Sequence, residues 1–330
     1  MLSGKSVEEK SMDSKNRHNL CVVLGGCGFL GSVITRRMVD QGWRVRVFDK
    51  EGTDDFRLKP VRSKIEIIRG DFMNAGDIRR ALQGSSTVLH FVGTTIPQTS
   101  MEDIDHDLHT NVLGTVRLLE VAREMKVERF IFSSSGGTVY GVPREFRPLR
   151  ETDPTDPISA YGISKLMVEK YIHLFYANYR LPYVILRFSN PYGESQSVTR
   201  PQGAVSVMLD KALKGEEIQV WGDGSVVRDY LYEEDLAEAV ESVLEHPRLE
   251  GIFNVGTGKG TSLNQLVDMI QRTHNVDVKV TYTPSRTFDV PYNVLDISKI
   301  GGTTGWKPQH FLQERIAAMG RNMKATLHGR

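Results

Sequence analysis

The stretch that decides the fold is Leu20-Cys-Val-Val-Leu24, followed at once by Gly25-Gly-Cys-Gly-Phe-Leu-Gly31. Its five apolar residues are typical of a strand buried on both faces of a parallel sheet. A helical pattern runs on from the glycines to about Gln41. This order is the context of a dinucleotide fingerprint, because the glycines let the backbone approach a pyrophosphate at the helix N-terminus. The spacing is GxxGxxG rather than GxGxxG, and an ordinary strand-to-helix turn is the alternative.

Strands and helices alternate beyond this opening. Further strands are predicted at 44–48, 65–68, 87–92, 129–132 and 182–188. A long helix is expected over 102–125, with Leu108, Val112, Leu119 and Val121 on its apolar side. Strands and helices of these lengths imply right-handed βαβ units and a doubly wound parallel sheet, which is an α/β fold of the Rossmann type.

Two carboxylates follow strands of this sheet. Asp49 lies 18 residues after Gly31, about where an acid accepts the adenosine ribose hydroxyls of a dinucleotide. An acid at this position repels a 2′-phosphate, so NAD is favoured over NADP, and the neighbouring Lys50 weakens that preference a little. Asp71 follows the strand at 65–68, and it either bonds the adenine amino group or caps the helix that begins near Asn74.

The stretch Tyr161-Gly-Ile-Ser-Lys165 carries the chemistry that we predict. A tyrosine and a lysine four residues apart lie on one face of a helix. A free phenol has a pKa near ~10, and a nearby ammonium lowers it, so the pair can shuttle a proton. A plain surface helix is the alternative. The hydroxyl-rich Ser133-Ser-Ser-Gly-Gly-Thr138 is predicted to be a turn at the carboxyl end of a strand, where open parallel sheets bind ligands.

Composition excludes several other classes of protein. The chain has 330 residues, of which 39% are hydrophobic and 25% charged, and its net charge is +1. Neither a nucleic acid nor an anionic membrane is therefore expected as the main partner. Cys21 and Cys27 form no CxxC or Cys/His cluster, which argues against a metal site and fits a reducing, cytoplasmic compartment. No apolar run reaches the ~18 residues of a transmembrane helix.

Three segments are expected along the chain. Residues 1–18 are polar and of mixed charge, and we interpret them as a flexible tail. Residues 19–200 should form the dinucleotide-binding domain. Residues 201–330 should bind mainly the substrate, with some return of the chain to the first domain.

The motifs together resemble the extended short-chain dehydrogenase/reductases, and among these the nucleotide-sugar epimerase/dehydratase group. The matching pieces are GGCGFLG, VFDK, GD at 70–71, HFVG, NVLGT, SSSGGTVYG, YGISK, LRFSNPYG, VRDYLYEEDLAEAV and FNVGTG. They stand in the family's order and cover nearly everything from residue 20 to about 300. Within the group, the chain is most similar to the 4-epimerases of UDP-hexoses and UDP-N-acetylhexosamines.

The resemblance implies bound NAD and a reaction at a sugar C4. Tyr161 would take the proton of the C4 hydroxyl while the C4 hydride passes to NAD, and Lys165 would hold the nicotinamide ribose. The 4-keto sugar would then turn over in the pocket and receive the hydride on its other face. The resemblance places the cofactor at Gly25, Gly28, Phe29, Leu30, Gly31, Asp49, Lys50, Asp71, Phe72, Phe91, Val92, Gly93, Asn111, Ser133, Tyr161, Lys165 and Phe188. On the residue type alone, Asn111 is more often a structural hydrogen-bonding group.

The resemblance also implies a site for a UDP-sugar. It places the sugar nucleotide at Asn190 and its diphosphate at Arg228 and Arg286, for which a planar guanidinium is suited. The alternative for Arg228 is a surface ion pair with the adjacent Asp229. Seven residues after Arg286, Asn293 stands where the family adjusts the room for an N-acetyl group. Its intermediate size leaves both hexose and N-acetylhexosamine open.

The chain departs from the family in its hydroxyl-rich turn, because SSSGGTVYG is one residue longer than the common SSSATVYG. If the extra residue follows the serines, Ser135 is the partner of Tyr161. If it precedes them, that place falls on Gly136, and Thr138 must supply the hydroxyl. We rank Ser135 slightly ahead. For both, a hydroxyl bonded to the turn's backbone is the alternative.

Other functions on this scaffold are disfavoured in different degrees. Dehydratases of this group carry an Asp-Glu pair where this chain has Gly136-Gly137-Thr138, which argues against dehydration. A 4-keto-sugar reductase is harder to exclude, although it would favour NADPH, which Asp49 opposes. A non-catalytic dinucleotide sensor would not need Tyr161 and Lys165. The resemblance implies a homodimer whose helices at 102–125 and 159–180 form a four-helix bundle, with a role in polysaccharide synthesis or galactose metabolism.

Overall fold

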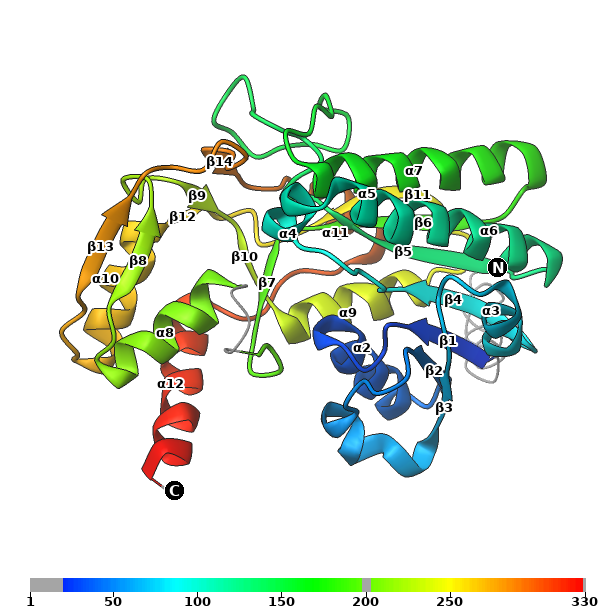
Figure 1. Ribbon diagram of the computed structural model, residues 1–330, viewed down its shortest axis with the longest axis horizontal. Helices are drawn as coiled ribbons and strands as arrows, with labels where there is room; N and C mark the ends of the chain where they lie inside the picture. The colour runs from blue at the N-terminus through cyan, green and yellow to red at the C-terminus, as the bar shows by residue number, and fades with distance from the viewer. Residues whose placement is uncertain (1–19, 198–202, 329–330) are drawn as a thin grey trace, which may run out of the picture.

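The protein is described by a computed structural model over residues 20–197 and 203–328. The expected tail at 1–18 and the expected domain boundary at 200 lie outside these residues. Figure 1 shows a large sheet with helices on both faces and a smaller group of strands and helices beside it.

The large sheet has seven strands, all parallel, in the order β11-β6-β5-β4-β1-β2-β3. The strands are β1 (Leu20–Leu24), β2 (Arg44–Asp49), β3 (Ile65–Arg69), β4 (Ser85–His90), β5 (Arg129–Ser135), β6 (Tyr183–Phe188) and β11 (Gly251–Val255). In register, Leu24 lies between Phe48 and His90, so the carboxyl ends of the central strands meet at one edge. The predicted doubly wound α/β fold is confirmed.

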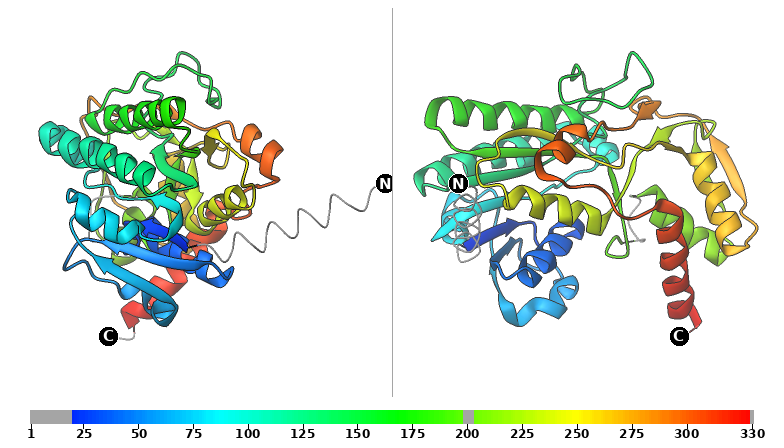
Figure 2. Two further views of the ribbon diagram at one scale, coloured as in Figure 1. Left: turned by 90° about the vertical axis from the view of Figure 1, so that its right-hand side faces the viewer. Right: turned by 180° about the vertical axis from the view of Figure 1, so that it is seen from behind.

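Helices cover both faces of the sheet, and each face has its own apolar core. One face carries α2 (Phe29–Asp40), which packs against α9 (Glu233–Leu244), and also η1 (Phe56–Lys64) and α11 (Ser298–Thr304). The other carries α3 (Ala75–Leu82), α6 (Gly114–Glu124) and α7 (Ala160–Tyr179). Figure 2 shows these layers end on, with α7 and α6 on the side of the sheet opposite α2.

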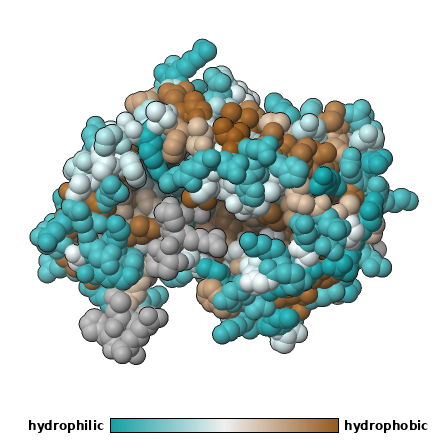
Figure 3. Space-filling view, viewed as in Figure 1, coloured by the Kyte–Doolittle hydropathy of each residue, from teal (hydrophilic) through white to brown (hydrophobic). Residues whose placement is uncertain are grey.

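The smaller part is built from short strands and three helices around a third core. Strand β8 (Ile218–Trp221) pairs with β13 (Val280–Thr283), and β7 (Asn190–Tyr192) pairs with β10 (Tyr230–Tyr232). Strand β9 (Val227–Arg228) lies between β12 (Thr261–Ser262) and β14 (Tyr292–Asn293). The helices are α8 (Ala204–Lys214), α10 (Leu263–His274) and α12 (Leu312–His328). Figure 3 shows this face of the molecule hollowed between the two parts.

The helix predicted over 102–125 is wrong in detail. The chain forms α4 (Pro97–Glu102), α5 (Ile104–Asp107), a π-helix at Leu108–Leu113, and then α6. The break follows from Asp103, whose side chain accepts the His106 N–H and so starts a new helix. The wider π-turn changes the helical register, and Leu108, expected inside, is 38% exposed while Val112 is buried.

The predicted turn at 133–138 also begins later than expected. Strand β5 continues through Ser135, because it pairs with β6 as far as Phe188. The Gly136 N–H then donates to the Phe188 carbonyl, and the turn starts there. The expected loop at 189–193 likewise contains β7, and the strand expected to reach Val92 ends at His90.

Candidate active site

The glycine turn makes an anion-binding helix start. Gly28 is the N-cap of α2, and no described side chain caps that helix or places an acid in its first turn. A Cβ on Gly31 would overlap the carbonyl oxygen of Gly25, so only glycine fits where α2 leaves the sheet. Gly25 has a φ of +79°, and a Cβ there would lie 2.9 Å from the Phe91 oxygen. The free N–H groups of α2 therefore suit a pyrophosphate.

Asp49 lies at the end of β2, beside this turn. Its carboxylate accepts the Cys27 N–H at 2.9 Å, the Lys50 N–H at 3.0 Å and the Thr53 hydroxyl at 3.2 Å. Arg69 is its register partner on β3, and the Arg69 guanidinium donates to the Cys27 sulfur. A carboxylate anchored in this way suits the adenosine ribose. Arg69 lies beside it, and without Asp49 this cation would favour the 2′-phosphate of NADP.

Asp49→Ala is expected to weaken NAD binding and to narrow the preference for NAD over NADP. The ribose hydroxyls lose their acceptor, while a 2′-phosphate no longer meets a carboxylate and still finds Arg69 nearby. Titration calorimetry with both dinucleotides measures this directly, with Asp40→Ala, at the far end of α2, as the control. Our assignment of Asp49 fails if the unaltered protein already binds NADP as tightly as NAD.

Asp71 does not cap α3, so that alternative is wrong. Asn74 is the N-cap, and its side chain accepts the N–H groups of Gly76 and Asp77. Asp71 is exposed, and among the described residues its carboxylate accepts a hydrogen bond from the Met73 N–H alone. Its carboxylate is therefore available at the sheet edge.

The first turn of α7 brings Tyr161 and Lys165 to the end of β5. Ser159 caps the helix by accepting the Gly162 N–H, and the Ser100 hydroxyl on α4 accepts the Tyr161 N–H at 3.0 Å. Lys165 is 9% exposed, and its Nζ donates to the Ser133 carbonyl at 2.9 Å. The same Nζ lies 5.6 Å from the centre of the Tyr161 ring. The lysine therefore reaches the strand end through the Ser133 backbone rather than its hydroxyl.

The expected lowering of the Tyr161 pKa is wrong for the protein alone. Burial, and then the charge of Asp107, raise the pKa of Tyr161 to about 12. Burial lowers the pKa of Lys165 to about 8, opposed by Asp107 and Glu169. The ammonium is held at the Ser133 carbonyl, while the half-buried Tyr161 lines the same pocket as the Asp107 carboxylate. A positive group must therefore enter the site before Tyr161 becomes a base near neutral pH.

The two candidate hydroxyls lie on either side of the end of β5: Ser135 is the last residue of the strand, and Thr138 stands in the turn that follows. The Thr138 hydroxyl is buried and has no hydrogen-bond partner among the described residues. A Cβ on Gly137 would lie 3.7 Å from the Ser135 hydroxyl and 3.6 Å from the Asn190 amide oxygen, which places Ser135 near Asn190. Gly136 is closely packed, because a Cβ there would lie 2.6 Å from the Leu295 side chain and 3.0 Å from the Arg187 carbonyl oxygen.

The two arginines lie together in the smaller part. Arg228 donates to the carbonyls of Val227 and Val290, and burial lowers its pKa, an effect that Arg286 reinforces and Asp289 opposes. Arg286 forms two bonds of 2.8 Å with Asp289 and lies over the Trp221 ring. The two guanidiniums therefore lie close enough to affect each other, with the Asp289 carboxylate near both charges and bonded to Arg286.

The predicted alternative for Arg228, an ion pair with Asp229, is wrong. The Asp229 carboxylate is fully buried between β9 and β10, and its hydrogen-bond partners come from other segments. It accepts the N–H groups of Thr257, Gly258 and Leu295 and the Thr257 hydroxyl. Asp229 therefore joins three segments of backbone and leaves Arg228 without an acidic neighbour in sequence to neutralise it.

Asn293 connects the smaller part to the turn after β5. It is buried on β14, and its amide donates to the Gly136 carbonyl at 2.8 Å. Its amide oxygen has no partner among the described residues. Asn293, which the family resemblance places where the room for an N-acetyl group is set, thus contacts the turn that leads from Ser135 to Thr138.

A small pocket adjoins the Tyr161–Lys165 pair, and sequence reasoning missed part of its lining. The pocket is lined by His90, Val92, Asp107, Asn111, Thr115, Phe132, Tyr161, Ser164, Lys165 and Val168. Asn111 is a hydrogen-bonding group as expected: its oxygen accepts the Thr94 N–H, and its amide donates to Thr95 and Asp107. Asp107 was not predicted. The sequence feature that could have identified Asp107 is its position four residues, or one helical turn, before Asn111.

Over the described residues 20–197 and 203–328, no three His, Cys, Asp or Glu side chains are grouped to hold a metal ion. Nor does any helix in these ranges have the length and apolar character needed to cross a membrane. The cysteines Cys21 and Cys27 are both free and buried.

Fold and site together define an α/β enzyme that binds a dinucleotide beside a tyrosine–lysine pair. The model of the NAD dependent epimerase/dehydratase family matches residues 21–256. A putative UDP-glucose 4-epimerase of Methanocaldococcus jannaschii is 34% identical over 92% of this chain and 98% of its own length. The chain belongs to the NAD-dependent epimerase/dehydratase family, within the extended short-chain dehydrogenase/reductases, and NAD is its cofactor.

Two further relatives show the range of this family. The crystal structure of a UDP-glucose 4-epimerase from Thermotoga maritima with UDP-glucose superposes with a TM-score of 0.86, at 31% identity, over 93% of this chain and 99% of that one. A dTDP-4-dehydro-6-deoxyglucose reductase of Escherichia coli is 30% identical over 91% of this chain and 96% of its own length.

Proposed function

We propose that this protein is an NAD-dependent 4-epimerase of UDP-hexoses or UDP-N-acetylhexosamines. The observation that carries the proposal is the placement of Tyr161 and Lys165 at the end of β5, on the sheet edge that holds the glycine turn. The arginine pair of the smaller part supports it, since Arg228 and Arg286 are suited to a diphosphate. The relatives named as UDP-glucose 4-epimerases support the same substrate class.

In this proposal each group has a task. NAD, when bound, accepts and returns a hydride at the sugar C4. Tyr161 holds the proton of the C4 hydroxyl and moves it, and the raised pKa of this phenol keeps it protonated until a positive charge enters the site. Lys165 orients the nicotinamide ribose from its place at the Ser133 carbonyl. The buried, unpartnered Thr138 hydroxyl, or Ser135 near Asn190, bonds the sugar oxygen.

Given UDP-galactose or UDP-N-acetylgalactosamine and no added cofactor, the purified protein is expected to form the 4-epimer until both forms coexist. The epimers differ in one hydroxyl's orientation, so their free energies should lie within ~1 kcal/mol and their ratio within roughly one decade of unity. Sugar-nucleotide chromatography measures this ratio. Deuterium at C4 should stay in the product, because it travels as hydride.

A 4-keto-sugar reductase is the second candidate, and the Escherichia coli reductase relative is the observation in its favour. Asp49, held by three donors at the ribose position, opposes the NADPH that such an enzyme would favour. Net consumption of NADPH with a 4-keto sugar, and no interconversion of either UDP-sugar, would replace the epimerase by the reductase. A sensor that binds NAD and turns over neither substrate is the third outcome.

The remaining expectations stand as proposals. Apolar side chains exposed on α5, the π-helix and α7 favour a homodimer through a four-helix bundle; they are Ile104, Leu108, Leu113, Ile163 and Leu174. Two free cysteines fit a reducing, cytoplasmic compartment. We also propose that the dinucleotide-binding domain ends at about residue 200 and that the following residues bind mainly the substrate. The proposed role is in polysaccharide synthesis or galactose metabolism.

A further inference from the structure

A buried carboxylate lies beside the proton-transfer pair, and the motifs assign nothing to it. Asp107 ends α5 and is 1% exposed. Its carboxylate accepts the hydroxyls of Thr95 and Ser164 and the Asn111 amide, the last at 3.0 Å. All three partners are neutral. An ionised carboxylate without a directly bonded cation is costly to bury, so its presence needs a reason.

The partners of Asp107 belong to three segments of the site. Thr95 stands in the turn after β4, Asn111 in the π-helix, and Ser164 inside YGISK, between Tyr161 and Lys165. A π-turn in an otherwise α-helical run often marks a functional site. With the Ser100 contact to the Tyr161 N–H, the Asp107–Ser164 bond fixes the first two turns of α7 to residues 95–111.

The charge of Asp107 acts on the same pocket. His90 faces it from β4 and is neutral, because burial and Lys165 lower the His90 pKa to about 3. Tyr161 and Lys165 face it from α7, and Glu169 lies one turn beyond Lys165. Asp107 raises the pKa of Tyr161, and together with Glu169 it raises that of Lys165 against the effect of burial. The Lys165 ammonium therefore has its counter-charge in this pocket.

We propose that Asp107 is a positioning residue of the proton-transfer pair: it holds the Tyr161–Lys165 face of α7 in place through Ser164, and its carboxylate is the counter-charge of the Lys165 ammonium in this pocket. The kinetic part of this inference rests on the proposed epimerase function. The electrostatic part concerns Lys165 alone and can be tested in a protein that turns nothing over.

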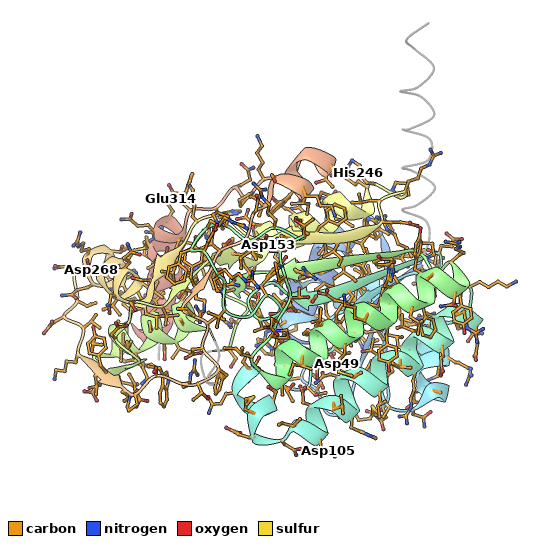
Figure 4. The ribbon with its side chains drawn as sticks, turned by 90° about the horizontal axis from the view of Figure 1, so that it is seen from above. Asp49, Asp105, Asp153, His246, Asp268 and Glu314 are labelled. Atoms are coloured by element: carbon orange, nitrogen blue, oxygen red, sulfur yellow. The ribbon has the colours of Figure 1, made fainter. Side chains whose placement is uncertain are left out.

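Asp107→Asn removes the charge and keeps the shape and most hydrogen bonds. Its kcat–pH profile for UDP-sugar epimerisation is expected to move as a whole to lower pH by about one unit. Loss of the negative charge at position 107 lowers the pKa of Tyr161 and the pKa of Lys165 alike. At pH 8, close to the Lys165 pKa of about 8, a fall of one unit reduces the protonated fraction from about one half to about one tenth, so kcat should fall roughly fivefold, with KM changed less than about twofold. Asp105→Asn is the control: it lies on the same helix, but exposed, at the outer edge in Figure 4.

The protonation of Lys165 supplies a readout apart from activity. Competitive labelling with acetic anhydride, followed by peptide mass spectrometry, gives the pH midpoint of the Lys165 amine, which Asp107→Asn should lower and Asp105→Asn should not. If no epimerase activity is found, the proposed function fails while this midpoint still decides the role of Asp107. An unchanged midpoint and an unchanged profile in a folded Asp107→Asn protein overturn the electrostatic role.

A second variant tests the positioning role by itself. Ser164→Ala breaks the bond to Asp107 and leaves every charge in place. We expect kcat to fall several-fold with no movement of the pH profile or of the Lys165 midpoint. Full activity in Ser164→Ala overturns the positioning role. Ser164→Ala therefore tests the positioning role of Asp107 even if the Asp107→Asn protein does not fold.

Discussion

Turnover of UDP-sugars should fall at least ~10²-fold in Tyr161→Phe, the usual contribution of a general acid–base group. The change removes one oxygen and leaves the ring, which lies beside Lys165 and lines the pocket with Phe132. The hydrogen bond from the Tyr161 backbone to Ser100 is unaffected, so α7 should keep its place. The loss therefore belongs to the C4 proton and should appear in kcat.

Tyr171→Phe is the matched control for this experiment. Tyr171 lies on the same helix but is exposed, so the change removes a phenol from α7 outside the site. Chromatographic rates, the absorbance of bound NAD(H) and circular dichroism should be measured for both variants. Near-normal turnover in Tyr161→Phe, with NAD still bound, would remove Tyr161 from the mechanism.

Arg228→Ala should raise the KM for a UDP-sugar by roughly 10- to 100-fold, as expected for a lost charge-assisted bond. Arg228→Lys should lie between Ala and the unaltered protein, because a point charge attracts the diphosphate but lacks the paired geometry of a guanidinium. The carbonyls of Val227 and Val290 hold the Arg228 fork in a fixed orientation. Turnover at saturation should change less than KM, since the diphosphate is remote from C4.

The control for Arg228 is Arg272→Ala, on α10 of the same part. Arg272 is well exposed and pairs with Asp268, which Figure 4 shows at the periphery, so its loss should change little. Steady-state kinetics on all three variants gives KM and kcat separately. Equal effects of Ala and Lys at position 228 would mean that the residue does not clamp phosphate.

Local rules account for the parts of the fold that the sequence predicted well. The run Leu20–Leu24, the glycine turn and α2 form one contiguous signal in the sequence. Each glycine of the turn lies close to backbone atoms, as the fingerprint predicts. The placement of Tyr161 and Lys165 on one helical face also follows from their spacing alone. The site residues carried over from the family still await experiment.

Contacts between distant segments account for what the sequence did not reveal. Strand β5 is longer than expected because β6 offers partners up to Phe188. The neighbours of Arg228 and Asp229 come from segments 28 to 66 residues away, so adjacency in sequence suggested the wrong ion pair. Asp107 escaped notice because its role depends on Ser164, which lies 57 residues further along the chain.

The return of β11 and α9 to the large sheet bears on how the chain folds during synthesis. Strand β11 is the edge partner of β6, α9 packs on α2, and the buried Arg129 on β5 binds the carbonyls that end α9. The nascent chain therefore exposes the apolar edge of β6 and one face of α2 until residues 233–255 have left the ribosome. Parallel pairing across such a separation is slow, so β11 and α9 should join the large sheet late in folding.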